Sequence, residues 1–198
     1  MTDVPEGPPG PTFFGYGSLV NGATHGYAGL APARLTGWGR LWRRAPGRRV
    51  SLLTVRRAPG GGLDGAVARL PGADWAALDA REAAYARADC TAELLPAPAV
   101  PVALYAVPGD GPPSGPEDPP ILLSYLDTVV AGFLALHGPE GPARFFAETE
   151  GWAAPVADDR VAPVYPRHVP GDGTVPALVD ALLAARGARV VRAAADWP

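Results

Sequence analysis

Residues 13–19 contain the first group of side chains and backbone amides that could take part in a reaction. They read Phe-Phe-Gly-Tyr-Gly-Ser-Leu, an aromatic run that enters a turn broken by Gly15 and Gly17. Glycine reaches backbone conformations that other residues avoid, and it lets a ligand approach the main chain closely. Consecutive amides in such a turn can point at an anion or at a polarised carbonyl. The turn is therefore either an ordinary tight strand end or a binding site built from backbone N–H groups, Tyr16 and Ser18.

The second candidate is a carboxylate on the inward face of a helix. Asp74 can cap a helix that runs from about Trp75 to Tyr85. Residues three and four positions apart share a helix face, and one face of this helix holds Trp75, Leu78, Glu82 and Tyr85. Because burial of an unpaired carboxylate is costly, an acidic residue on this face needs an explanation.

Glu82 has two interpretations. It can pair with a neighbouring arginine, Arg81 or Arg87, at the edge of the helix face. Alternatively, it lies in a partly dry pocket, where desolvation raises the pKa of a carboxyl group toward the range useful for proton transfer. The second interpretation makes Glu82 a candidate catalytic base.

Composition narrows the chemistry further. The 198 residues include 17 basic residues, all of them arginine, and no lysine. The chain therefore has no lysine for a Schiff base or a phosphate loop, and arginine does not deprotonate in proteins. Proton transfer near neutral pH falls to a carboxylate, a histidine, a tyrosine or the single cysteine, Cys90. The formal charge of −3 offers no electrostatic reason to expect a nucleic-acid partner.

Strand patterns dominate the first part of the chain and helix patterns the last part, which favours an α+β fold. Residues 1–11 form a Pro/Gly tail that we expect to be disordered, and residues 12–198 are expected to form a single domain. Strands are predicted at 12–16, 33–44, 50–57, 64–70, 89–95 and 100–107, with loops at 60–62 and 108–120. Helices are predicted at 75–85, 121–137, 142–149 and 175–186, and residues 152–172 are expected to be irregular.

Three stretches resemble a known family. Residues 15–19 resemble the glycine-tyrosine-glycine-serine-leucine signature of the gamma-glutamylcyclotransferase superfamily, which includes the ChaC-like glutathione-degrading branch. Residues 78–82, Leu-Asp-Ala-Arg-Glu, are similar to the segment that ends in the family's catalytic glutamate. The run from Ser124 to Pro139 is a third point of similarity. Together these stretches span roughly residues 12 to 150.

The resemblance implies a fold and a reaction. The fold is a small, closed, mixed β-barrel flanked by helices, with the active site at the barrel mouth beside the glycine turn. In the reaction a γ-glutamyl amide is cleaved by its own α-amine, which releases 5-oxoproline and the leaving amine or peptide. Neither a metal nor an organic cofactor is required.

The resemblance also implies roles for particular residues. Glu82 would accept a proton from the α-amine and deliver it to the departing nitrogen. The amides of Gly17, Ser18 and Leu19 would stabilise the negative charge on the attacked carbonyl oxygen, while Tyr16 and Ser18 hold the glutamyl group. Tyr85 would orient Glu82 or the α-carboxylate, although the family's tyrosine stands a little farther beyond the glutamate.

Other positions are expected to be structural. Cys90 lies in a predicted strand, where a small buried side chain is its default role. Tyr125 either packs in the core or reaches the pocket. The acidic pair Asp158-Asp159 is expected to be solvated.

Targeting signals are not apparent. The N-terminus lacks the charge and the apolar core of a signal peptide. The most apolar run, 121–136, is shorter than the roughly 20 residues that cross a bilayer. One cysteine excludes an intrachain disulfide, which fits a reducing compartment. We therefore expect a cytoplasmic, bacterial protein without a membrane partner.

Rival functions have less support. A nucleophile elbow centred on Ser18 would need glycine at the positions of Tyr16 and Val20. No pair of histidines or cysteines has metal-ligand spacing, so we expect no metal site. A non-catalytic small-molecule-binding or regulatory module on the same fold is the alternative function. The pairs Arg43-Arg44 and Arg48-Arg49 could contact a substrate carboxylate or simply form an exposed hairpin face.

Overall fold

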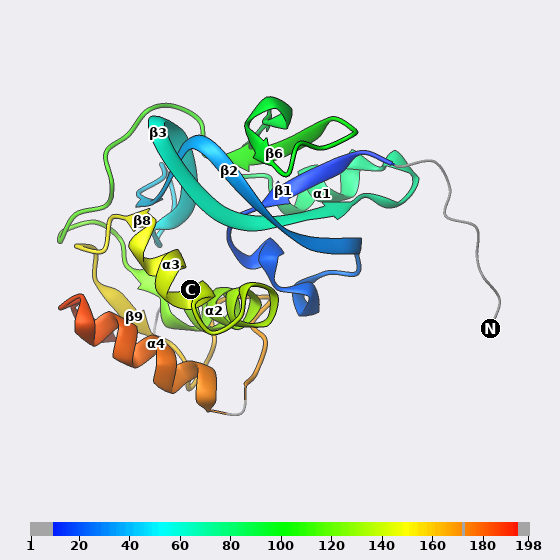
Figure 1. The fold of residues 1–198 in the computed structure, drawn as a ribbon. Coiled ribbons are helices and arrows are strands. Elements are labelled where there is room, and N and C mark those ends of the chain that lie inside the picture. Colours follow the sequence, from blue (N-terminus) through cyan, green and yellow to red (C-terminus); the bar gives the residue numbers. More distant parts are fainter. Residues whose placement is uncertain (1–9, 172, 194–198) are drawn as a thin grey trace, which may run out of the picture.

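Two long antiparallel strands form the centre of the fold in the computed structural model, which describes residues 10–171 and 173–193 (Figure 1). Strand β2 spans Ala28–Arg43 and strand β3 spans Leu52–Arg69. Their register runs from Arg43 opposite Leu52 to Ala28 opposite Arg69. A turn around Pro46-Gly47 joins them. Strand β2 begins five residues before its predicted start, and β3 combines the two strands predicted at 50–57 and 64–70.

Strand β3 continues through the glycines at 60–62, so the predicted loop there is wrong. The register shifts between Thr36 and Trp38 on β2, which marks a β-bulge opposite these glycines. Gly60 adopts a φ of 78°, a left-handed conformation that favours glycine. A Cβ on Gly61 would lie 2.8 Å from the Trp38 carbonyl oxygen. The three glycines thus bend the hairpin, because a bulge increases the local twist without ending the pairing.

The main sheet has seven strands in the order β4-β6-β1-β3-β2-β5, with β8 also paired to β2. Strand β1, Thr12–Gly15, lies between β3 and the parallel strand β6, Val102–Ala106. The shorter strands are β4 (Ala86–Asp89), β5 (Leu94–Leu95) and β8 (Thr149–Glu150). The end strands β4 and β5 are not paired with each other in the described part of the chain, so the sheet is a curled half-barrel. The α+β class and the mixed sheet flanked by helices are confirmed, whereas the closed barrel that the resemblance implied is wrong, because the two end strands of the described sheet do not meet.

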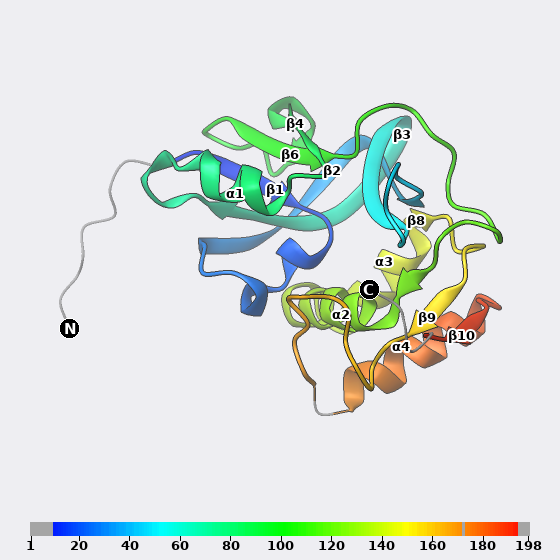
Figure 2. The ribbon, with the colours of Figure 1, turned by 180° about the vertical axis from the view of Figure 1, so that it is seen from behind.

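The helices flank this sheet. Helices α2 (Leu123–His137), α3 (Gly141–Ala147) and α4 (Thr174–Ala185) lie on one side of the long hairpin, below it in Figure 1. The view from behind shows α1, Trp75–Arg81, beside β1 and β6 (Figure 2). A second, parallel sheet joins β7 (Ile121–Leu122), β9 (Val156–Asp158) and β10 (Val190–Arg192) next to α4. The late helices begin within two residues of their predicted starts.

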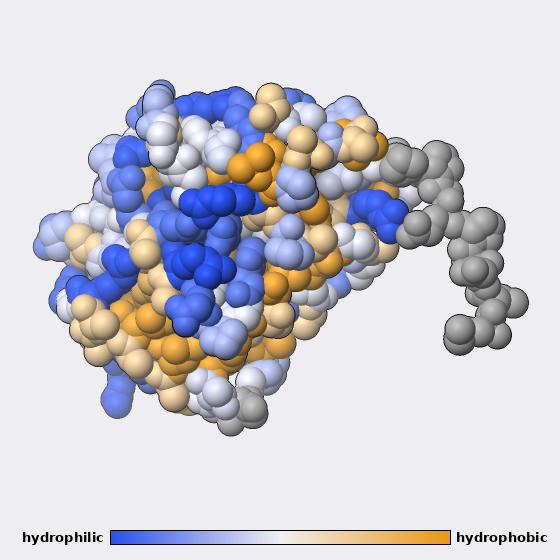
Figure 3. Space-filling view, in the orientation of Figure 1, coloured by the Kyte–Doolittle hydropathy of each residue, from blue (hydrophilic) through white to orange (hydrophobic). Residues whose placement is uncertain are grey.

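The core lies between the hairpin and α2. One cluster of buried side chains joins the inner faces of the sheet and of these helices, and it includes Phe14, Leu35, Trp42, Leu63, Leu126 and Phe133. A smaller cluster packs α1 on β1 through Phe13, Leu19, Leu70, Leu78 and Tyr105. On the outside, hydrophobic residues gather over α4, below a band of hydrophilic residues over α3 and its neighbouring strands (Figure 3).

The sequence also led to expectations about the N-terminal tail and about membrane-spanning segments. Residues 1–9 of the expected tail lie outside the described residues, and the Pro11 carbonyl accepts a hydrogen bond of 2.9 Å from the Leu70 amide. Within residues 10–171 and 173–193, no helix is both long and apolar enough to cross a membrane.

Candidate active site

The glycine turn follows β1 directly and packs tightly on α2. A Cβ on Gly17 would lie 2.5 Å from the Tyr125 hydroxyl oxygen and 3.1 Å from Leu53 Cδ2. A Cβ on Gly15 would lie 2.6 Å from Cβ of Leu19. Both glycines are therefore required by close approach, since side chains at these positions would collide with the neighbouring residues.

The turn leaves amide groups without protein partners. A short 3₁₀ helix over Ser18–Val20 begins here, and its first hydrogen bond joins the Val20 amide to the Gly17 carbonyl at 2.9 Å. Among the described residues, no acceptor pairs with the amide of Gly17 or of Leu19. The Ser18 amide faces the Tyr125 hydroxyl oxygen. Within the described residues, two of the three N–H donors expected from the sequence, those of Gly17 and Leu19, are therefore available at this turn.

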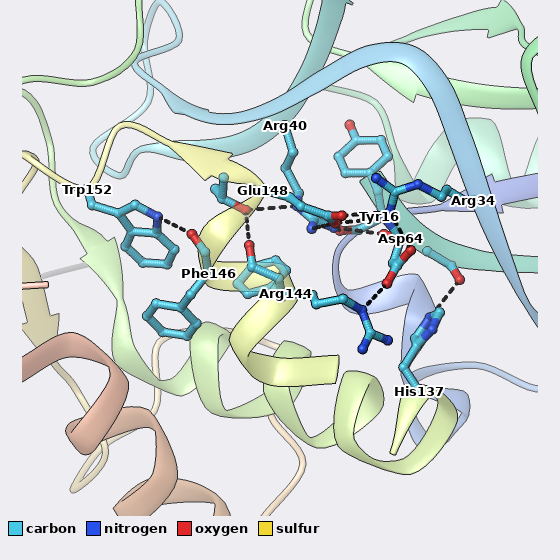
Figure 4. Close-up of polar contacts among 12 residues, drawn as sticks. Tyr16, Arg34, Arg40, Asp64, His137, Arg144, Phe146, Glu148 and Trp152 are labelled. Atoms are coloured by element: carbon cyan, nitrogen blue, oxygen red, sulfur yellow. Dashed lines mark hydrogen bonds and ion pairs between the residues drawn. The ribbon is translucent and has the colours of Figure 1, made fainter. Parts of the chain in front are cut away.

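A buried arginine on the main sheet hydrogen-bonds to the glycine turn and fixes its position. Arg40, on β2, is 0% exposed, and its Nη1 donates to the carbonyl oxygens of Tyr16 and Asp64, each at 3.0 Å (Figure 4). Its Nε donates to Thr149 Oγ1 at 2.8 Å. Because the C=O and N–H of a trans peptide point in opposite directions, this contact directs the Gly17 N–H away from Arg40.

The Arg40 charge is balanced by two carboxylates. Glu148 Oε2 lies 3.5 Å from Arg40 Nη2, and Arg34 Nη1 binds both Glu148, at 2.6 Å, and Asp64, at 2.7 Å. Arg144 Nε adds a further contact with Asp64 at 2.6 Å (Figure 4). Burial lowers the pKa of Arg40 to about 10, opposed by Glu148 and Asp64, so the side chain remains a cation at neutral pH. This network was not predicted from the sequence.

Helix α1 brings Glu82 to the turn. As predicted, the Asp74 side chain caps the helix, accepting from the Ala76 amide at 2.9 Å. The helix is shorter than predicted, because it ends at Arg81 and Glu82 follows it with a φ of −100° and a ψ of 30°. Leu78 is fully buried, and the chain then turns through a hydrogen bond of 2.8 Å from the Tyr85 amide to the Glu82 carbonyl.

Asp79 ties this helix to the strands that carry the turn. It accepts a hydrogen bond from the Tyr105 hydroxyl, and its Oδ1 forms an ion pair with Arg87 Nη1 at 3.2 Å. The carbonyl of the same Tyr105 accepts from the Tyr16 hydroxyl. One chain of contacts therefore links α1, β6 and the end of β1, and fixes the helix relative to the glycine turn.

Arg81 makes the second link. Its Nη1 donates to the Thr24 carbonyl at 3.1 Å, and its Nη2 lies 3.5 Å from Ser18 Oγ. Its Nε donates to Glu82 Oε1 at 3.1 Å. Arg87, the other arginine considered as a partner of Glu82, pairs with Asp79 instead. The Leu-Asp-Ala-Arg-Glu segment thus contributes a core anchor, two ties to neighbouring elements and one carboxylate in the pocket.

Glu82 combines both interpretations derived from the sequence. Its side chain is only 17% exposed and is paired with Arg81. Burial raises the pKa of the Glu82 carboxyl above its ordinary value, and the opposing influence of Arg81 and Arg167 does not cancel this rise. The carboxyl is therefore a better proton acceptor than an exposed glutamate.

The Glu82 side chain lines two adjoining cavities. The larger has a volume of about 290 Å³, and the smaller, about 30 Å³, lies against the turn. The residues that line both are Ser18, Leu53, Glu82, Tyr85 and Tyr125. Tyr16, Gly17 and Leu19 line the smaller cavity only. The structure thus brings all six residues named from the sequence to one site.

Two tyrosines shape the cavity walls. Tyr85 donates a hydrogen bond of 3.2 Å to the Leu53 carbonyl, and burial raises its pKa. Tyr125 also lines both cavities, so of the two roles considered for it, it reaches the pocket. Burial likewise raises the pKa of Tyr125, and both hydroxyls stay protonated at neutral pH.

The irregular segment after β9 forms the outer wall. Tyr165, Pro166 and Arg167 line the larger cavity, and the Tyr165 ring packs edge-on against Tyr125 at 4.9 Å. The segment is anchored by Asp159, which accepts from the Ser124 amide at 2.8 Å. Asp159 is 3% exposed, so the expectation that it is solvated is wrong.

The other reactive side chains do not assemble a rival site. Cys90 is fully buried and burial raises the pKa of its thiol to about 12, which leaves no thiolate at neutral pH. His25 donates through Nε2 to the Leu19 carbonyl at 3.0 Å while Nδ1 accepts from the Tyr27 amide. No histidine contacts Ser18 Oγ within the described residues. No cluster of three potential metal ligands occurs in that part of the chain.

The contact between Gly17 and Tyr125 predicts the behaviour of a pair of substitutions. Gly17→Ala is expected to destabilise the protein by about 1–3 kcal/mol in urea unfolding, because the new methyl group overpacks against the Tyr125 hydroxyl. Tyr125→Phe removes that oxygen. Gly17→Ala should therefore reduce the free energy of unfolding less in the Tyr125→Phe background than in the unmodified protein. Additive effects of the two substitutions would show that another contact demands glycine.

Comparison with known proteins supports the fold. No family model and no curated protein matches the sequence. A crystal structure of an uncharacterized protein from Homo sapiens is similar, with a TM-score of 0.54 at 18% identity, covering 69% of this chain and 86% of that chain. A structure described as gamma-glutamyl cyclotransferase gives 0.52 at 16% identity with the same coverage. YkqA from Bacillus subtilis gives 0.50 at 18% identity, over 67% of this chain and 51% of that chain.

At identities this low, similarity of structure concerns the fold, and the activity has to be argued from the residues of this chain. The mixed β-sheet and the flanking helices agree with what the resemblance of residues 15–19 and 78–82 implied. The chain therefore has the gamma-glutamylcyclotransferase-like fold.

Proposed function

We propose that the protein cleaves a γ-glutamyl amide by attack of the substrate's own α-amine, releasing 5-oxoproline and the leaving amine or peptide. The observation that carries this proposal is the position of Glu82. Its desolvated carboxyl lines the same small cavity as the Gly17 and Leu19 amides, which have no acceptor among the described residues. A proton acceptor and oxyanion donors in one cavity are the two requirements of this acyl transfer.

The reaction balances without a co-reactant. The α-ammonium group gives a proton to Glu82, and the resulting amine forms a bond with the γ-carbonyl carbon. The carbonyl oxygen becomes negatively charged and accepts hydrogen bonds from the turn. The amide C–N bond then breaks as Glu82 returns the proton to the leaving nitrogen. The attacking nitrogen loses its second proton by the same route, so that the lactam keeps one N–H and the amine leaves as its ammonium. Oxidation states do not change, and no water is consumed.

The protein's contribution is positioning and electrostatics. The turn amides are held in place through the Arg40 contact with Tyr16, so they need no reorganisation as charge develops. Removal of one such donor typically costs about 10²–10³ in rate. Holding the glutamyl chain folded for closure of a five-membered ring removes much of the entropic barrier. We assign the walls around the glutamyl group to Tyr16, Ser18 and Tyr85, which line the smaller cavity.

The direct test is product formation. Purified protein is incubated with γ-glutamyl amino acids, glutathione and γ-glutamyl amines, and 5-oxoproline and the released amine are both measured. We expect the two products to form in equal amounts. Release of glutamate instead would indicate hydrolysis and contradict the cyclisation. Saturable binding of these compounds without any product would favour the non-catalytic binding module.

The pH dependence follows from the Glu82 environment. Catalysis needs the deprotonated carboxyl, so kcat/KM should fall as the pH decreases through a pKa above the ordinary glutamate value, which burial raises. Arg81 opposes this rise. Arg81→Met is therefore expected to move the acid limb of the kcat/KM profile to higher pH, measured with a single substrate. An unmoved or lowered acid limb would assign the limb to another group.

A further inference from the structure

Two arginines face the larger cavity from segments far apart in the sequence. Arg48 lies in the connection between β2 and β3, and Arg167 lies in the segment after β9. Both side chains are exposed, and both line the cavity that Glu82 also lines. The two guanidinium groups therefore lie at the rim, beyond the turn that would hold the reacting amide.

Neither arginine is neutralised by the protein. Within the described residues, no carboxylate forms an ion pair with Arg48 or Arg167, whereas Arg81 is paired with Glu82. Among the described residues that line this cavity, Glu82 is the only acidic one. Three arginines and one glutamate thus make the cavity positive, although the whole chain carries a formal charge of −3. A cavity with this charge attracts an anionic ligand.

The wall that carries Arg167 is held in place on both sides of it. The Tyr165 amide donates to Ser124 Oγ at 3.4 Å, and the Val169 amide donates to Thr128 Oγ1 at 3.2 Å. His168 Nδ1 is 3.2 Å from the Ser124 carbonyl oxygen. Arg167 is therefore presented by an ordered backbone, even though its side chain is exposed.

Each of the two arginines acts on a different residue of the site. Arg167 favours the ionised form of Glu82, while Arg48 opposes the rise in the pKa of Tyr85. A γ-glutamyl amino acid has two carboxylates, one on the glutamyl group and one on the leaving portion. A simple γ-glutamyl amine has only the first. Two unpaired guanidinium groups at the rim therefore suit the carboxylate of the leaving portion, which a γ-glutamyl amine lacks.

We infer that Arg48 and Arg167 form a carboxylate subsite for the leaving portion, so that the preferred substrates are γ-glutamyl amino acids or peptides rather than γ-glutamyl amines. This inference rests on the proposed function of the same site. It adds a specificity-determining pair of residues to the catalytic machinery and places that pair at the leaving-group end of the cavity.

A matched pair of substrates tests the subsite. γ-Glutamylalanine and γ-glutamylethylamide differ only in the carboxylate of the leaving portion, and both carry the same glutamyl group. We expect kcat/KM to favour γ-glutamylalanine by about tenfold. Arg48→Met and Arg167→Met should each reduce this ratio, and the double variant should bring it close to one. Arg49→Met, an exposed neighbour that does not line the cavity, should leave it unchanged.

Equal kcat/KM for the two compounds in the unmodified protein would overturn the subsite while leaving the cyclisation intact. A preference that survives in the double variant would overturn the role of the two arginines. If neither compound yields 5-oxoproline, the proposed function fails, and calorimetric binding of the same two compounds tests the subsite separately. Tighter binding of γ-glutamylalanine that is lost in the double variant supports it, and equal binding overturns it.

Discussion

Glu82→Gln is expected to lower kcat for 5-oxoproline formation by about 10²–10⁴, the usual cost of losing a general base. Glutamine is nearly isosteric with glutamate and preserves the side chain that lines both cavities. It cannot accept the proton of the α-ammonium group or deliver one to the leaving nitrogen. The measurement is the rate of 5-oxoproline release at saturating substrate, compared at equal protein concentration.

Two controls separate catalysis from folding. Glu150→Gln removes an exposed glutamate that pairs with Arg56 at 2.8 Å and lies outside both cavities, so its rate should match that of the unmodified protein. Thermal unfolding reports on the fold of Glu82→Gln. Because burial raises the pKa of Glu82, the unmodified protein should gain stability relative to Glu82→Gln as the pH falls through that pKa. Retention of more than about a tenth of the rate would remove Glu82 from the proposed role.

Arg40→Met is expected to reduce the free energy of unfolding by about 3–5 kcal/mol, as found when one partner of a buried charge network is removed. Methionine approximates the length of the side chain but donates no hydrogen bond. The carbonyls of Tyr16 and Asp64 would lose their donor, and Glu148 would lose the cation that lies 3.5 Å away. Urea unfolding monitored by fluorescence gives the comparison, since a tryptophan on the same strand, Trp42, is buried.

The matched control for this variant is Arg56→Met, which lies on the same hairpin. Arg56 makes one exposed ion pair with Glu150, so its loss should cost no more than about 1 kcal/mol. Similar losses for Arg40→Met and Arg56→Met would contradict a buried network that holds the turn. Because Arg40 binds the carbonyl next to the Gly17 amide, Arg40→Met should also lower kcat under conditions where the variant is folded.

Much of the site could be predicted because its signals are local. Neighbouring atoms lie so close to Gly15 and Gly17 that only glycine fits there. This requirement is visible in the sequence as two glycines at fixed spacing. The placement of Glu82 followed from spacing along one helix, with Leu78 as its core anchor. The prediction tolerated an error in helix length, since Glu82 directly follows the last helical residue and keeps its direction toward the pocket.

The features that were wrongly predicted from the sequence depend on contacts between residues that lie far apart along the chain. Asp159 was expected to be solvated, yet it is buried because Ser124, 35 positions earlier, supplies its amide and its hydroxyl. The glycines at 60–62 looked like a loop, because local propensity does not show that β2 continues the pairing on both sides of a bulge.

Local patterns identify the residues that are capable of the chemistry, because the chain has no lysine and its carboxylate and glycine turn stand in recognisable sequence contexts. The surroundings of these residues depend on how distant segments pack together. Arg40 binds the Tyr16 carbonyl from a separate strand, and Arg167 reaches the cavity from a segment about 85 positions beyond Glu82. The physical reason is that backbone periodicity orients a side chain relative to its own element, while burial and charge pairing depend on which elements pack together.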